Sequence, residues 1–251
     1  MSTIAISGVV LAFIVCGTLF GVFIRFRLSE AQLDGDAKDV IKMAAAFIAT
    51  LTALVLGLLI ATAKSSFDTK IAQVKQLAAG VILLDELLAQ YGPETINARQ
   101  IGRRNFNLMV DRIWHEHKSE NSSPFEMNRE AQMFLKEVYS LTPENDFQRS
   151  LKTRIAEALK DLAQTRLSLF VQSGSTISTP FLMILTFWLT IIFAIFGLLT
   201  RINVLVGATL LICALSVSAS IFLIVDFDRA FEGVIKIPSA PLRNALPPLN
   251  P

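Results

Sequence analysis

Four apolar stretches dominate the chain, and each is long enough to cross a lipid bilayer as a helix. They cover residues 4–24, 43–63, 181–199 and 204–225 of a chain of 251 residues. A membrane-spanning helix needs about 20 apolar residues, because each residue adds about 1.5 Å along the helix axis. The composition agrees, with 53% hydrophobic and 18% charged residues. We therefore expect an all-α, polytopic membrane protein with four transmembrane helices.

The four spans also limit the topology and the mechanism. None of them has a charged residue or a histidine in its interior, which argues against proton relays and charge-coupled transport. An even number of crossings places both termini and the polar segment 64–179 on one side of the membrane. By our count that side holds seven Lys and Arg residues near the membrane, against five on the other. The positive-inside rule then favours a cytoplasmic position for segment 64–179.

The second span runs into the polar segment without a turn signal. The stretch "ALVLGLLIATAKSSFDTKI", residues 53–71, begins apolar and ends charged, yet no Gly-Pro or Asn-Gly separates its halves. Further on, apolar residues recur at spacings of three or four, which indicates an amphipathic helix. We expect one helix over 41–90, about 75 Å long, whose apolar stripe packs against neighbouring copies in a homo-oligomer. The stripe consists of Ile71, Val74, Leu77, Val81, Leu84 and Leu88.

Turn signals divide the rest of segment 64–179 into further helices. In "QYGPE", Gly92 can cap the long helix and Pro93 can open the next one, which should run over 93–118. "ENSSP" then breaks the chain, with Ser122 or Ser123 as the next N-cap. A third helix should end at position 140.

The fourth helix of this bundle should begin at "LTPEN". Thr142 would be its N-cap, with Pro143 at the first position and Glu144 in the first turn. The segment has no strand signal, so we expect a helical bundle. The expected organisation is transmembrane helices 1 and 2 over 1–63, a cytoplasmic bundle over 64–179, transmembrane helices 3 and 4 over 180–225, and a docking tail over 226–251.

Small residues recur every four positions along the second span. Residues of this size let helix backbones approach closely in lipid, where no hydrophobic force drives association. The contact is either between copies or among the four helices of one copy, and the pattern leaves both open. The residues are Ala45, Ala49, Ala53, Gly57 and Ala61.

An adjacent ridge of the same helix is apolar in the middle and bears hydroxyl groups at both ends. Thr50, Leu54, Leu58 and Thr62 form it. We expect this ridge to line a narrow pore, since a lipid-facing ridge has no need of hydroxyl groups. Lys64 would add one positive charge per copy below the leucines and attract small anions. In the alternative, Lys64 only snorkels at the membrane interface.

Three stretches of the chain resemble the bestrophin-like membrane proteins of bacteria and plants. They are "LGLLIATAKSSFDTK", "VILLDELLAQYGPE" and "VDFDRAFEGVIKIPSAPLRNAL". The more distant bestrophins are pentameric chloride channels whose second span lines the pore and continues into a cytoplasmic helical bundle. Placing Leu56 and Gly57 on their Leu-Gly pair puts Leu58, Leu54 and Thr50 at the pore neck, with Thr50 where that family has a large apolar residue. The resemblance implies a pentameric anion channel of the bacterial inner membrane.

Acidic residues gather where the fourth span ends. The resemblance suggests a calcium clasp here, because eukaryotic bestrophins have one near this point. Asp226, Asp228 and Glu232 would make a poor cage, because calcium takes six to eight oxygen ligands. We expect no metal, and an ion pair between Asp226 and Arg229, which lie three residues apart on a helix.

Motifs of catalysis and nucleic-acid binding are missing from the sequence. It contains no nucleophile triad, glycine-rich phosphate loop or metal motif, and its net charge is only +2. His115 and His117 lie two apart, so on a helix they point in different directions, and Trp114 beside them is expected to pack on the bundle. We expect no enzyme, cofactor or nucleic-acid partner. The partners should be lipid, small anions and further copies of the chain.

The tail "SAPLRNALPPLNP" is proline-rich and has no helical period. Such a tail is either free or wraps over another part of the protein. Because it belongs to the resembling stretches, we favour docking, with Ser239, Pro241 and Arg243 as anchors and Arg243 paired with an acidic residue of the bundle. Two functions remain open: an ion channel, or a membrane-anchored helical scaffold or sensor without a pore.

Overall fold

The computed structural model divides the chain into two units, and the residues it describes contain helices but no strand. We call the first the membrane unit; it comprises Met1–Phe67, Ser175–Arg229 and Gly233–Ile235. We call the second the bundle unit; it comprises Asp68–Gly174, Ala230–Glu232 and Lys236–Pro251. The structure describes residues 3–28, 35–115, 129–171, 179–200, 203–231 and 233–245.

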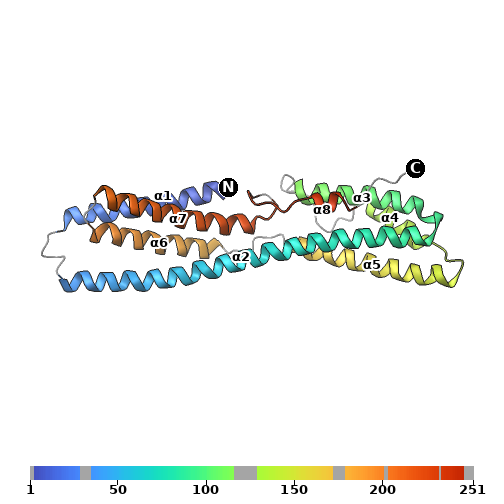
Figure 1. The fold of residues 1–251 in the computed structure, drawn as a ribbon, viewed down its shortest axis with the longest axis horizontal. Helices are drawn as coiled ribbons and strands as arrows, with labels where there is room; N and C mark the ends of the chain where they lie inside the picture. Colours follow the sequence, from blue (N-terminus) through green and yellow to red (C-terminus); the bar gives the residue numbers. More distant parts are fainter. Residues whose placement is uncertain are drawn as a thin grey trace. The chain divides into compact units, whose positions relative to one another are not determined.

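The membrane unit is built from four helices that carry the four apolar stretches (Figure 1). They are α1 (Thr3–Arg27), the first part of α2 (Gly35–Tyr91), α6 (Thr179–Leu199) and α7 (Val204–Asp228). Each contains a segment long and apolar enough to cross a membrane. The prediction of an all-α fold with four transmembrane helices is therefore confirmed.

Helices α1 and α6 approach each other closely in the membrane unit. A Cβ atom added to Gly17 would lie 2.7 Å from the carbonyl oxygen of Thr190, and one added to Gly21 would collide with the carbonyl oxygen of Ala194. A Cβ on Gly197 would collide in turn with the carbonyl oxygen of Thr18. Small residues thus do bring helices together here, but on α1 and α6. The sequence signal for this contact is Gly17-x-x-x-Gly21, which was not among the predicted packing residues.

Helix α2 is unbroken over 57 residues and contributes to both units. This confirms the prediction that the second span continues into the polar segment. The prediction that its apolar stripe packs against neighbouring copies is wrong. Val74, Leu77 and Leu88 are buried within the bundle unit of a single chain, because the other helices of this unit supply the covering surface.

The bundle unit packs the second part of α2 against three further helices (Figure 1). Its core gathers Leu84 and Leu88 of α2 with Phe134, Leu151 and Ile155 of the others. A short helix of the tail, α8 (Ala240–Arg243), also belongs to this unit. The other elements are the 3₁₀ turn η2 (Pro93–Thr95), α3 (Ile96–His115), α4 (Arg129–Ser140) and α5 (Asp146–Val171).

Two predicted helix boundaries can be compared with the structure. Gly92 has a φ of 138°, which favours glycine, and Pro93 opens the next element as predicted, first as η2. The predicted start of α5 at Thr142 and Pro143 is wrong. Asn145 is the cap instead, because its Oδ1 accepts the Gln148 N–H at 2.8 Å while Gln148 Oε1 accepts the Glu144 N–H. The predicted caps Ser122 and Ser123 lie outside the described residues.

Candidate functional site: the exposed face of α2

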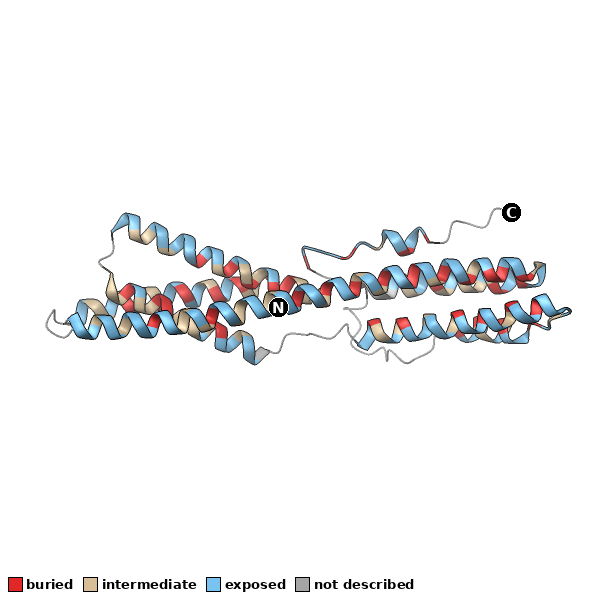
Figure 2. Ribbon diagram, turned by 60° about the horizontal axis from the view of Figure 1, so that its bottom comes forward, coloured by how far each residue is buried: buried red, intermediate tan, exposed pale blue. Residues whose placement is uncertain are grey.

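The predicted pore ridge lies on a face of α2 that its own chain leaves uncovered. Leu54 is 71% exposed and Leu58 67% exposed, and Thr50 and Thr62 are exposed beside them. Figure 2 shows how exposed and buried positions are distributed along the helices. The opposite face of α2 packs into the membrane unit through the buried Thr52 and Ala63, among other residues. The ridge is therefore available to lipid or to another copy of the chain.

The hydroxyl groups of this ridge are satisfied within the helix. Thr50 Oγ1 donates to the carbonyl oxygen of Ala46 at 2.9 Å, and Thr62 Oγ1 donates to that of Leu58 at 2.9 Å. A threonine bonded in this way leaves no unpaired donor and can face lipid at little cost. The hydroxyl groups by themselves therefore do not distinguish a pore from a lipid-facing surface.

The small residues of α2 lie beside this ridge and are mostly unused by the protomer. Ala45 is buried and Ala49 half-buried, but Ala53, Gly57 and Ala61 are exposed. A Cβ atom added to Gly57 would find no atom within 4 Å. Packing within one chain therefore explains only the beginning of the stripe. Its other end remains a surface to which a second helix can approach closely.

Lys64 makes a contact that neither sequence interpretation, the pore ring or the snorkelling lysine, had predicted. Its Nζ lies 5.6 Å from the ring centre of Phe67 and 5.8 Å from that of Phe227, and these two ring centres are 5.2 Å apart. A cation over aromatic faces is attracted by their negative π surfaces. Lys64 thus joins α2 to α7 at the end of the membrane unit. Phe227 is 163 positions further along the chain, so no local pattern pointed to this contact.

The acidic residue at the end of α7 organises the following turn. Asp226 is fully buried, and its two carboxylate oxygens accept the N–H groups of Val234 and Ile235, each at 2.8 Å. The pairing of Asp226 with Arg229 stays a prediction. Glu232 and His117 lie outside the described residues, and the residues that are described contain no cluster of three metal-ligating side chains.

The tail docks on α3 in the bundle unit. Trp114 Nε1 donates to the carbonyl oxygen of Ile237 at 2.9 Å, and the Trp114 ring meets Phe231 edge-on with ring centres 5.5 Å apart. Arg243 Nη2 lies 2.7 Å from Asp111 Oδ1, so Arg243 is paired with an acidic residue of the bundle. These contacts place Trp114 at the centre of the docked region.

The other expected anchors of the tail are less buried than residues beside them. Pro241 is exposed, and Ser239 is half-buried and makes no capping bond with its side chain. Their neighbours Ile237 and Leu242 are buried instead. Neither of these two was among the predicted anchors, although both are large apolar residues in a tail otherwise rich in proline and polar groups.

A three-residue ion pair holds α2 to α3 in the bundle unit. Asp85 Oδ1 accepts from Arg99 Nε at 3.0 Å, and Asp85 Oδ2 accepts from Arg99 Nη2 and Arg103 Nη2 at 2.8 Å each. The Asp85 side chain is only 17% exposed. Burial alone would raise the pKa of the Asp85 carboxyl, but the hydrogen bonds from Arg99 and Arg103 outweigh it and hold this pKa below its ordinary value. The carboxylate is therefore the anionic centre of this contact.

We expect Asp85→Asn to destabilise the bundle unit at neutral pH by about 2 kcal/mol, because two arginines lose their anionic partner. A carboxyl with a lowered pKa stabilises the fold above its unfolded-state pKa of about 4, and this stability is lost as the pH falls through the folded-state value. The wild type should therefore lose more stability than the variant below about pH 4. With Trp188 changed to phenylalanine, Trp114 is the remaining tryptophan. Its fluorescence during heating then reports on the bundle unit.

The matched control is Asp146→Asn, whose pair with Arg149 is exposed on both sides. It should change the melting temperature little, since exposed pairs contribute little. Equal melting temperatures for wild type and Asp85→Asn at pH 7 would contradict the expected role of Asp85.

Comparison with known proteins places this fold in a family. Residues 12–242 match the family model described as Bestrophin-like domain. No curated protein and no solved structure matches the chain. The matched region contains all or part of every helix described above, together with the tail as far as Leu242. The chain, with its four apolar helices, therefore belongs to the Bestrophin-like family and is a membrane protein.

Proposed function

We propose that several copies of this chain, most simply five, surround an axis lined by the membrane part of α2 and conduct small anions. The observation that carries the proposal is the exposed face of α2, where Leu54 and Leu58 stand beside Ala53, Gly57 and Ala61. The resemblance to bestrophins, whose second span lines the pore, supports the same assignment. The protein would lie in the bacterial inner membrane with the bundle unit in the cytoplasm.

In this proposal the two leucines form stacked apolar rings around the axis. A narrow apolar constriction sheds water and so resists ions without any charge, and it opens when it widens. A ring of Lys64 side chains would raise the local concentration of anions, an effect that weakens with salt. The contacts of Lys64 with Phe67 and Phe227 would fix the height of that ring.

Conductance in planar lipid bilayers tests the proposal. The double variant Leu54→Ala, Leu58→Ala should widen the constriction; a barrier lowered by about 1.4 kcal/mol would raise conductance about tenfold. The matched control changes Leu211 and Leu215 to alanine, because these residues are exposed on α7 with the same spacing. That control should leave conductance unchanged.

Selectivity tests the part assigned to Lys64. Lys64→Glu should move the reversal potential in a salt gradient toward the value for cations, and Lys64→Gln should move it about half as far. Because both variants lose the contact with the two phenylalanines, a difference between them reports charge alone. If neither the wild type nor the widened variant carries current under any tested condition, the channel proposal fails.

The alternative function is a non-conducting, membrane-anchored scaffold or sensor. The internally bonded threonines of α2 are compatible with it, because they let the ridge face lipid. In this case the bundle unit is the working part of the protein, and the fact that it has its own core favours this function. This function predicts an oligomer that carries no current, either as the wild type or as the widened leucine variant.

A further inference from the structure

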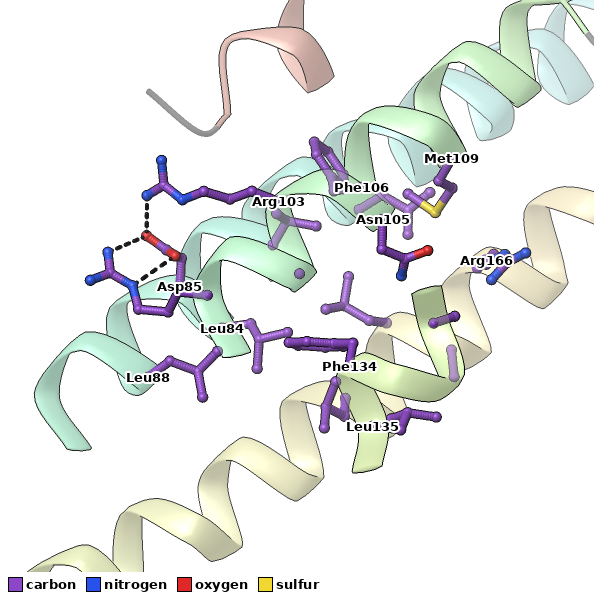
Figure 3. Close-up of a pocket in the computed structure, with 18 residues that line it drawn as sticks. Leu84, Asp85, Leu88, Arg103, Asn105, Phe106, Met109, Phe134, Leu135 and Arg166 are labelled. Carbon is purple, nitrogen blue, oxygen red and sulfur yellow. Dashed lines mark hydrogen bonds and ion pairs between the residues drawn. The ribbon is translucent and has the colours of Figure 1, made fainter. Parts of the chain in front are cut away.

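One buried hydroxyl group in the bundle unit has no use within the described part of the chain. The acidic group of the open pocket between α2, α3, α4 and α5 is satisfied, because both carboxylate oxygens of Asp85 accept hydrogen bonds from arginines of α3 (Figure 3). Tyr91, at the end of α2, is different. It is only 3% exposed, yet its hydroxyl group has no hydrogen-bond partner among the described residues. A buried polar group in this state carries a cost and needs an explanation.

Two glutamates face this hydroxyl group. Burial raises the pKa of the Tyr91 phenol above its ordinary value, and the negative charges of Glu94 and Glu144 raise it further. Gln148 fixes the backbone of one glutamate here, because its Nε2 donates to the Tyr91 carbonyl oxygen at 3.1 Å and its Oε1 accepts the Glu144 N–H at 2.8 Å. The carboxylate of the other, Glu94, folds back over Gly92, where an added Cβ atom would collide with it.

The basic side chains next to these glutamates in the sequence have other partners. Arg149 is paired with Asp146 at 2.9 Å, and Lys152 Nζ donates to the carbonyl oxygens of Tyr139 and Leu141. Both glutamates are exposed, and within the described ranges neither carboxylate has an ion pair. Two carboxylates and one hydroxyl oxygen are therefore three acceptor groups that the described residues do not supply with a donor.

A primary ammonium group matches these three acceptors. It is a compact charge with three N–H donors and no acceptor, whereas the planar fork of an arginine suits a single carboxylate. Calcium would need six to eight oxygen ligands, and the described residues form no cluster of three metal-ligating side chains. Because Glu94 and Glu144 are exposed, their side chains can turn aside and admit an ammonium group to the hydroxyl of Tyr91.

Apolar side chains are exposed at the same end of the bundle unit. Ile96 opens α3 and Phe147 lies in the first turn of α5, and both are more than half exposed. Figure 1 shows that the start of α3 and the start of α5 lie together with the ends of α2 and α4. An ammonium group carried by an apolar body would therefore find both kinds of contact here.

We propose that this end of the bundle unit is a docking site for a partner protein that inserts the ammonium group of a lysine between Glu94, Glu144 and the hydroxyl group of Tyr91. Apolar neighbours of that lysine would pack on Ile96 and Phe147. All five residues belong to the bundle unit, so the proposal does not rest on the channel activity.

Isothermal titration of the full-length protein in detergent with a capped peptide, Ser-Leu-Lys-Phe-Ser, tests the site. We expect saturable binding of one peptide per chain, which weakens with added salt. The same peptide with an acetylated lysine has lost its charge and should bind about tenfold more weakly. Equal binding of the two peptides would overturn the proposal.

Removal of the hydroxyl group separates binding from stability. Tyr91→Phe should raise the Kd of the lysine peptide about fivefold. It should leave the melting temperature of the bundle unit unchanged or raise it, because a buried group without a partner is lost. The matched control is Tyr139→Phe, since Tyr139 is exposed; it should change neither quantity. A lower melting temperature for Tyr91→Phe would show that the hydroxyl group is already satisfied and would overturn the proposal, as would an unchanged Kd.

The glutamates provide an independent test. Glu94→Gln and Glu144→Gln should each raise the Kd about fivefold, as expected for an exposed charge pair. Glu157→Gln, at an exposed position further along α5, should leave the Kd unchanged. Equal effects of all three variants would mean that only the general charge of the protein attracts the peptide, which contradicts a defined site. Absence of binding by the wild type at millimolar peptide would also overturn the proposal, including the case in which a lysine of another copy occupies the site.

Discussion

Gly21→Leu is expected to prevent the membrane unit from folding. At this position even a Cβ atom would collide with the carbonyl oxygen of Ala194 on α6. The obstacle is backbone, which cannot rotate away as the end of a side chain can, so α1 and α6 must separate. The loss of their contact should cost more than about 4 kcal/mol, at the extreme of single substitutions. The yield of monodisperse protein after extraction from membranes measures the effect.

Gly8→Leu is the control for this prediction. Gly8 lies on the same helix, but a Cβ atom there would find no atom within 4 Å. The Gly8→Leu variant should be extracted with the wild-type yield. It therefore separates the effect of a larger apolar side chain on α1 from the effect of a side chain at the contact with α6. A Gly21→Leu protein that is as abundant and as heat-stable as the wild type would show that α1 and α6 do not meet here.

Gly57→Leu is expected to disperse the proposed oligomer while the protomer remains folded. Nothing in the same chain lies within 4 Å of a Cβ atom at Gly57, so the fold has room for the new side chain. The leucine side chain would force away by several ångströms any neighbouring copy that approaches the stripe Ala53, Gly57 and Ala61. The association would then weaken, because close packing is the main attraction between helices in lipid. Light scattering coupled to size-exclusion chromatography gives the mass of the protein in the complex.

The control for Gly57 is Gly207→Leu on α7. A Cβ atom added to Gly207 would also find no atom within 4 Å, so this variant adds the same side chain elsewhere in the membrane unit. It should keep the mass of the wild type. An unchanged mass for Gly57→Leu would remove the small-residue stripe as an assembly surface, and with it the main support for the axis through α2.

Local sequence signals predicted the helices well. The four spans follow from the length of the apolar stretches, and the continuity of α2 follows from the absence of a breaker between its apolar and polar parts. Gly92 and Pro93 mark the end of α2 because one favours a positive φ and the other lacks the N–H of a helix interior. At "LTPEN" the sequence offers two capping residues, Thr142 and Asn145. The structure uses Asn145, together with the side chain of Gln148.

Contacts between distant segments could not be predicted from the sequence. Periodicity shows which face of a helix is apolar but not what covers it, so the stripe of α2 was assigned to other copies although α3, α4 and α5 bury it. The pairs Lys64–Phe227 and Asp85–Arg99 join residues on different helices, and no spacing rule connects them. The exposed position of Leu54 and Leu58 was predictable in part, because the hydroxyl-bearing ridge to which they belong already differed from the rest of the span.

Docking of the tail determines when the bundle unit can complete its packing during synthesis. The ribosome synthesises α3 long before the tail residues that cover it. Trp114 contacts Phe231 and Ile237, and Asp111 pairs with Arg243, so these contacts form only after the tail has been made. The bundle unit therefore reaches its final packing only after the last membrane helix has left the ribosome. A chain that stops short within the last span would lack Phe231 and Ile237, so the side of the Trp114 ring that they cover would stay exposed.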